Sequence, residues 1–91
     1  MNKRNLEIAG KEYVGDWLCW NEKQLSALPT EKEKREYIHT EGNFESAAGD
    51  MAEYDDNSNP RHGIERDCAA DCIYEGMCKA VKKFLSQYEK E

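Results

Sequence analysis

The residues from Ile64 to Tyr88 form the longest stretch of helical periodicity in the chain, and the rest of the protein has to pack against it. At about 100° per residue, Ile73, Met77 and Leu85 fall on one broad apolar face, together with alanines and aromatic residues between them. The opposite face is polar, with acidic residues early and lysines late, which complements the helix dipole. Other elements of the chain must therefore cover the apolar face.

The size and composition of the chain limit what can cover it. The chain has 91 residues, of which 38% are hydrophobic, so we expect one small domain, residues 1–91, with a thin core. Five Tyr and two Trp add apolar area that suits half-buried positions. A monomer of this size has difficulty burying so much aromatic surface, and the chain is therefore expected to form a homodimer.

The N-terminal segment is expected to be extended. Leu6 and Ile8 precede a Gly-containing turn at residues 9–11, and Tyr13 and Val14 follow it. Residues with β propensity on both sides of a turn predict a short β-hairpin. The aromatic residues Trp17 and Trp20 come next, and a tryptophan is more often part of a core than of a ligand site.

Two short helices are predicted after this aromatic segment. The first begins near Asn21 and ends before Pro29, which cannot continue a helix. Thr30 and Glu33 then form a capping box, the signal that starts the second helix. This second helix is highly charged with a narrow apolar stripe, so it is expected to lie on the surface and to end at Gly42.

A further helix is predicted to begin at Asn43. Phe44, Ala47, Ala48, Met51 and Ala52 recur at helical spacing, and their small side chains allow close packing on the long C-terminal helix. The predicted fold class is therefore mainly α: a small single domain of three to four helices around a long C-terminal helix, with a short N-terminal β-hairpin.

The four cysteines allow two interpretations. Cys68 and Cys72 lie four residues apart on the polar side of the long helix, where they can line a second, smaller contact with the N-terminal part of the chain. Alternatively, the protein is a small zinc-stabilised domain that uses Cys68 and Cys72 with Cys19 or His62. The spacing matches no common zinc signature, so the first interpretation is favoured.

Several functional classes find no support in the sequence. The two histidines, His39 and His62, belong to no known nucleophile or metal motif, so no enzyme activity, catalytic residue or cofactor is predicted. The bases at 32–35 alternate with acids, which argues against direct nucleic-acid binding.

Polar residues at 55–59 resemble a calcium loop, but Pro60 and Arg66 break that pattern. No apolar run is long enough for a signal peptide or a membrane span, and a cytoplasmic location is expected.

The acidic residues give the one positive functional hypothesis. Six acids follow one another between residues 41 and 56 with no Lys or Arg, and they account for the net charge of −6. Such a surface steers association with basic proteins. We therefore predict a small acidic protein-protein interaction module, an inhibitor or nucleic-acid mimic such as a phage-type anti-defence inhibitor, that covers a basic surface of a nucleic-acid-binding partner. The predicted partner-binding residues are Glu41, Phe44, Glu45, Asp50, Glu53, Tyr54, Asp55 and Asp56.

Overall fold

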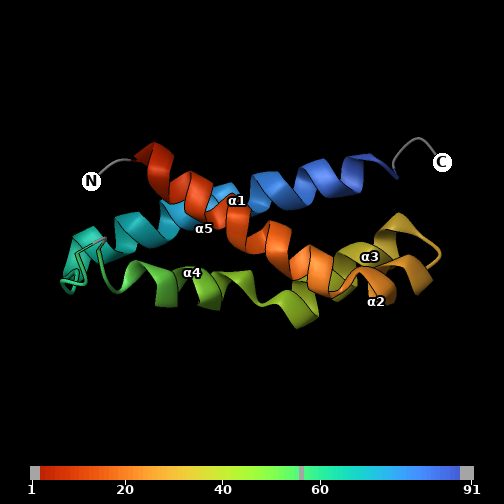
Figure 1. Ribbon diagram of the computed structural model, residues 1–91, viewed down its shortest axis with the longest axis horizontal. Coiled ribbons are helices and arrows are strands. Elements are labelled where there is room, and N and C mark those ends of the chain that lie inside the picture. Colours follow the sequence, from red (N-terminus) through yellow and green to blue (C-terminus); the bar gives the residue numbers. More distant parts are fainter. Residues whose placement is uncertain (1–2, 56, 89–91) are drawn as a thin grey trace.

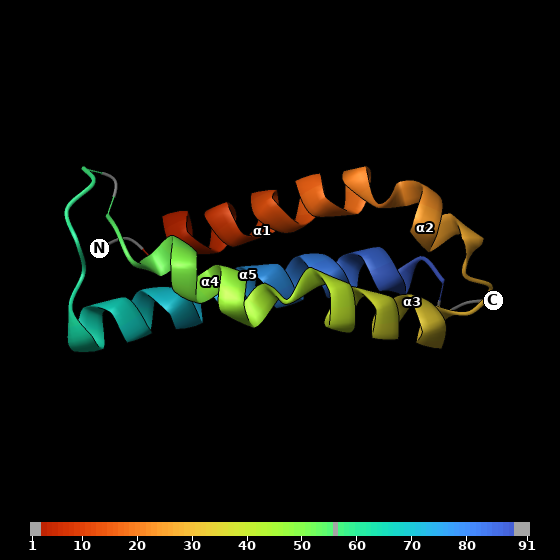
Figure 2. The same cartoon turned by 90° about the horizontal axis from the view of Figure 1, so that it is seen from below.

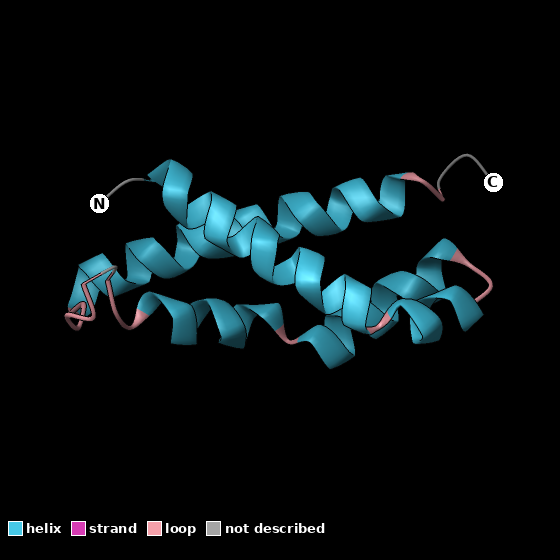
Figure 3. Ribbon diagram, viewed as in Figure 1, coloured by secondary structure: helices cyan, strands magenta, loops and turns pink. Residues whose placement is uncertain are grey.

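The computed structural model describes residues 3–55 and 57–88, and almost all of them are helical (Figure 3). The elements in chain order are α1 (Lys3–Trp20), α2 (Glu22–Ala27), α3 (Glu31–Tyr37), the π-helix η1 (Ile38–Gly42), α4 (Phe44–Ala52) and α5 (Gly63–Ser86). The mainly α fold around a long C-terminal helix is therefore confirmed. The described residues contain no strand, only a single bridge between Tyr54 and Pro60.

The helices form two layers. In one layer, α3, η1 and α4 run antiparallel to α5 (Figure 1). In the other, α1 lies across this pair, and α2 continues beyond the end of α1 and bends toward α3 (Figure 2). The bundle measures 43 × 20 × 18 Å, so it is long and thin. One cluster of buried side chains joins the two layers, with Val14, Leu25, Ile73, Met77 and Leu85 almost completely enclosed.

The predicted N-terminal hairpin is wrong, because residues 3–20 form the 18-residue helix α1. Leu6, Gly10 and Val14 are its buried residues, and they recur every four positions, so that they share one face. Gly10 is thus not a turn residue but a residue of the helix interface. The contact between α1 and α5 is the most extensive in the molecule, whereas a second, smaller contact was expected there.

Close contact between α1 and α5 depends on a glycine on each helix. A Cβ atom built on Gly10 would overlap the carbonyl oxygen of Ile73, and one built on Gly76 would overlap the carbonyl oxygen of Glu7. The two helices therefore meet backbone to backbone at their crossing. Ala69 and Cys72 of α5 are also buried, so small side chains occupy much of this side of the helix.

The helix capping signals are confirmed in part. The Thr30 hydroxyl accepts a hydrogen bond from the Glu33 amide at 3.1 Å, as the capping box predicts. Asn21 and Asn43 precede α2 and α4, but neither side chain caps its helix. The amide group of Asn21 instead donates to the Trp17 carbonyl at 2.9 Å and accepts from the Tyr37 hydroxyl at 3.1 Å, which ties α1 to α3.

The charged helix α3 is not simply a surface helix, because Lys34 is only 5% exposed. Its ammonium group donates to the Leu28 carbonyl oxygen and lies 4.7 Å from the centre of the Tyr88 ring. Both contacts compensate for the burial of the charge. Lys34 thereby joins the α2–α3 turn to the end of α5.

Candidate functional site

Charge is distributed unevenly among the helices. Acidic and basic residues occur in equal numbers in α1, in α3 and in α5. The segment from Ile38 to Ala52, which holds η1 and α4, carries Glu41, Glu45 and Asp50 and no Lys or Arg. Glu53 and Asp55 extend this acidic run beyond the helix. One edge of the bundle is therefore negative while the other helices neutralise their own charges.

Four of the predicted partner-binding acids are exposed: Glu41, Glu45, Asp50 and Glu53. The ion pairs among the described residues are Arg35–Glu31, Lys79–Glu7 and Lys79–Glu75, and none of them involves these four acids. Their charges are consequently available to a partner. Asp56 lies outside the described residues, and Tyr54 is 55% exposed next to Glu53.

Phe44 is a correction to the predicted site. It was expected to give apolar anchoring to a partner, but it is only 8% exposed. Its ring packs edge-on against two aromatic rings of α1, with centroids 6.0 Å from Tyr13 and 5.3 Å from Trp17. Phe44 therefore fastens the start of α4 to α1 and is not accessible to a partner.

Glu45 faces a different neighbourhood from Asp50 and Glu53. It lines a groove between α4 and α5 together with Tyr74 and Cys78. A hydrogen bond to the Cys78 side chain, the negative charge of its thiolate form and burial raise the pKa of Tyr74, and the Glu45 carboxylate adds to the shift. The predicted acids therefore do not share one face.

Asp55 has a structural role in the loop that follows α4. Its Oδ1 atom accepts hydrogen bonds from the backbone amides of Asn57 and Asn59, both at 2.9 Å. The Asn59 amide hydrogen bond is the largest influence on the carboxyl group and lowers the pKa of Asp55. The carboxylate oxygen thus holds the loop closed.

Arg61 completes this loop. Its guanidinium donates to the carbonyl oxygens of Ala52 at 3.1 Å and Tyr54 at 2.8 Å, where a base also complements the helix dipole. The Arg61 amide donates to the Glu53 carbonyl at 2.9 Å. These bonds fix the backbone around Tyr54, so its exposed ring is presented from an ordered loop.

Trp20 is the prominent surface residue that the sequence did not predict, since a core position was expected. It is 79% exposed, whereas Trp17 is half-buried against Phe44 and Tyr37. The two tryptophans lie about 60° apart around the axis of α1. The packing of Tyr37 and Phe44 against Trp17 therefore decides which of the two is exposed.

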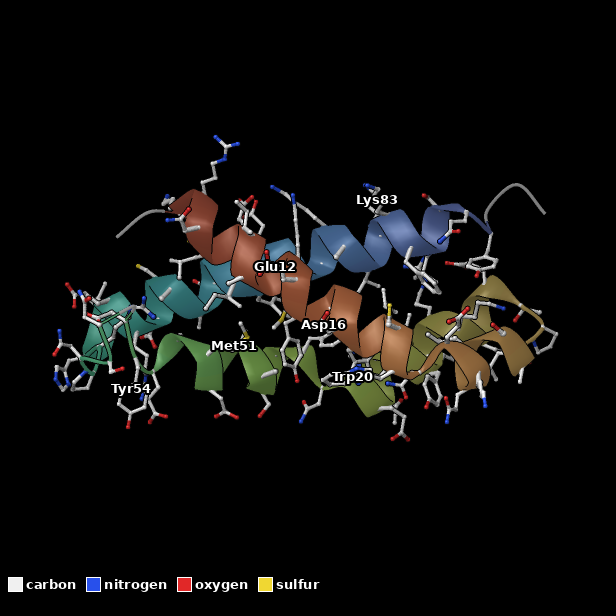
Figure 4. All side chains as sticks on the ribbon, viewed as in Figure 1. Glu12, Asp16, Trp20, Met51, Tyr54 and Lys83 are labelled. Atoms are coloured by element: carbon white, nitrogen blue, oxygen red, sulfur yellow. The ribbon has the colours of Figure 1, made fainter. Side chains whose placement is uncertain are left out.

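Acidic and aromatic side chains from both layers, together with Met51, are spread along one face of the bundle. Figure 4 shows Glu12, Asp16 and Trp20 along α1, with Met51 and Tyr54 along α4 and its loop. We call these five residues the acidic-aromatic face. Asp50 and Glu53 are exposed next to Met51 and Tyr54 in the chain, although consecutive helical positions point about 100° apart. Tertiary packing, not sequence proximity, places the α1 residues on the same face of the bundle as Met51 and Tyr54.

The described residues do not form the zinc site of the alternative interpretation. Cys19, Cys68 and Cys78 are exposed and Cys72 is buried, and all four are free. Within residues 3–55 and 57–88, no three His, Cys, Asp or Glu side chains are placed so that they could hold a metal ion. The burial of Cys72 agrees with its packing as a small apolar residue.

No protein-family model, curated protein or solved structure matches this chain. None of the helices in the described part of the chain combines the length and the apolar character that a membrane crossing requires.

Proposed function

We propose that the protein is a small interaction module that docks a basic surface of another protein through α4, the loop after it and the acidic-aromatic face. The observation that carries this proposal is the segregation of charge. The acids of η1 and α4 are exposed and make no ion pair within the described residues, while every other long helix balances its own charge. A surface of one sign attracts a surface of the opposite sign and increases the rate of encounter.

The aromatic residues supply the second requirement of a protein interface. Exposed charges at a rim mainly tune the encounter rate, whereas buried aromatic anchors carry more of the affinity. Trp20 and Tyr54, at 79% and 55% exposure, have the apolar area for this role. A basic protein that normally binds nucleic acid is the partner class that fits, so the module acts as an inhibitor or nucleic-acid mimic.

The test combines charge removal with a change in salt. A basic partner is first captured on the immobilised wild-type chain. At low ionic strength, the double variant Asp50→Asn/Glu53→Gln should bind this partner about tenfold more weakly than the wild type, a loss of about 1.4 kcal/mol in binding free energy. The difference should shrink as salt rises, because exposed charges are screened over roughly 8–10 Å at physiological ionic strength. Titration calorimetry with the purified partner measures both effects.

A matched control separates this site from a general effect of net charge. Glu22→Gln/Glu36→Gln removes the same charge from exposed positions on α2 and α3. This control should retain the affinity of the wild type, while Trp20→Ser should lose affinity at both salt concentrations. Equal binding by the Asp50/Glu53 variant, the control and the wild type would show that the acidic run is only a solvated surface.

A further inference from the structure

A groove of about 520 Å³ runs between the α3–η1–α4 segment and α5. No residue of α1 lines it, and it is thus separate from the acidic-aromatic face. Its floor is apolar and includes Ile38, Val81 and Leu85. The volume lies within the range of roughly 300–1,000 Å³ that small-molecule sites occupy.

Two unusual backbone features form one wall of this groove. The chain continues from α3 into the π-helix η1, and the next residue, Asn43, has a left-handed conformation with φ 46° and ψ 49°. A π-helical turn is rare and occurs frequently at functional sites. Asparagine adopts the left-handed conformation more readily than most residues other than glycine, and it commonly follows the end of a helix. Ile38, His39 and Asn43 from this segment all line the groove, so both backbone features shape the same surface.

The polar rim of the groove is basic at one end. Arg35 and His39 lie one turn apart on the α3–η1 segment, and Lys82 lies across from them on α5. Lys82 makes no ion pair with a described residue, and the Arg35 guanidinium uses its Nε and one terminal nitrogen for Glu31. In a chain of net charge −6, this end has the sign opposite to that of α4.

The other end of the groove has a different character. Tyr74 and Cys78 precede Lys82 on the same face of α5, at intervals of four residues. Glu45 is the one acid among the lining residues, and its effect on the pKa of Tyr74 places it at this end. A negatively charged group is therefore favoured beside Lys82 and disfavoured beside Tyr74, which gives a bound molecule a direction.

We propose that this groove binds a small anionic amphiphile, a monocarboxylate with an aliphatic or aromatic tail. The carboxylate lies beside Arg35 and Lys82, whose charges form the stronger class of hydrogen bond with it, and His39 is a further polar neighbour. The tail lies along Val81 toward Tyr74 and removes the apolar floor from water. This site differs from the proposed docking surface for a basic protein: the two share only Phe44 and Glu45 at the start of α4, and they attract opposite charges.

The test uses two probes with the same tail and opposite charge, decanoate and decyltrimethylammonium, below their micelle concentrations. Calorimetry of the full chain should show saturable binding of one decanoate, and about tenfold weaker binding of the cation. Amide chemical-shift changes should concentrate at residues 35–45 and 74–82. Equal binding of both probes, or binding that does not saturate, would overturn the proposal.

Two neighbouring lysines give a matched pair of variants. Lys82 lines the groove, whereas Lys83 does not line it and projects from another side of α5 (Figure 4). Both are exposed near the C-terminal end of α5, so the two charge reversals should lower the melting temperature by similar, small amounts. Lys82→Glu should weaken decanoate binding about tenfold, and Lys83→Glu less than about twofold. The same loss in both variants would show that only net charge attracts the probe, and the proposal would fail.

Discussion

Gly10 and Gly76 determine how closely the two longest helices approach. Each lacks the side chain that would meet the backbone of the opposite helix, at Ile73 and Glu7 respectively. Glycine is normally unfavourable inside a helix, by roughly 0.5–1 kcal/mol relative to alanine. The close packing of α1 on α5 has to compensate for that cost at both positions.

Substitution of either glycine tests this contact. Gly10→Ala and Gly76→Ala should each lower the free energy of unfolding by about 1–3 kcal/mol, because the added methyl group forces the helices apart. Gly15→Ala and Gly49→Ala are matched controls, since a Cβ at these positions meets nothing within 4 Å. These controls should raise stability by roughly 0.5–1 kcal/mol. Urea denaturation measures all four, and a stabilising Gly10→Ala would contradict the close contact.

The loop between α4 and α5 is the element that orders the acidic end of the molecule. The Asp55 carboxylate accepts two backbone amides, and Arg61 binds two carbonyl oxygens at the end of α4. Ser58 adopts a left-handed conformation with φ 65°, which the surrounding hydrogen bonds hold in place. Tyr54 is thus exposed on a loop whose backbone groups are largely satisfied.

The pKa of Asp55 predicts how acid affects this loop. Backbone amides lower the pKa of the folded carboxyl group below its ordinary value of 3.8. Its contribution to stability is therefore present above that value and is lost as the pH falls through the lower folded pKa. At neutral pH the free energy of unfolding should be larger for the wild type than for Asp55→Asn. This difference should disappear in strong acid.

Urea denaturation across that pH range measures the Asp55 effect. Asp50→Asn is the control, because it removes the same charge from the exposed surface of α4 and leaves the loop bonds in place. A difference between wild type and Asp55→Asn that stayed constant down to strong acid would refute the role of the carboxylate.

At the scale of the whole molecule, a bundle of only two helix layers leaves large apolar side chains on the surface. Trp20 is 79% exposed and Ile64 is 81% exposed in a bundle only 18–20 Å thick. A chain this small buries a limited fraction of its surface. Both self-association and partner binding can cover such residues, and they differ in their response to salt.

The expected homodimer can be separated from the proposed partner complex on that basis. Two copies of charge −6 repel each other, so added salt should strengthen a dimer held by apolar contacts, whereas it should weaken the binding of a basic partner. Sedimentation equilibrium at high micromolar concentration should give a mass above that of one chain, and Trp20→Ser should reduce it. The mass of one chain at every concentration and salt level would exclude the dimer.

The sequence by itself determined the helical elements with strong local signals. The periodicity of residues 64–88 predicted α5, the capping box at Thr30 predicted the start of α3, and the small-residue stripe predicted that α4 packs on α5. The run of acids between 41 and 56 was also a local property. These features depend on residues close together in the chain, for which the spacing alone carries the information.

The tertiary structure alone decided the role of α1 and the composition of the candidate site. The sequence predicted Gly10 to be a turn residue, because glycine has a low helix propensity. Only the facing backbone of α5 explains why a glycine stands at this position of the helix α1. The same packing set the ring of Phe44, whose spacing had already placed it on the packing stripe of α4, against Tyr13 and Trp17 of α1. It also left Trp20 exposed beside Asp16. Which side chains reach the surface depends on contacts between residues far apart in sequence, because burial is a property of the assembled layers.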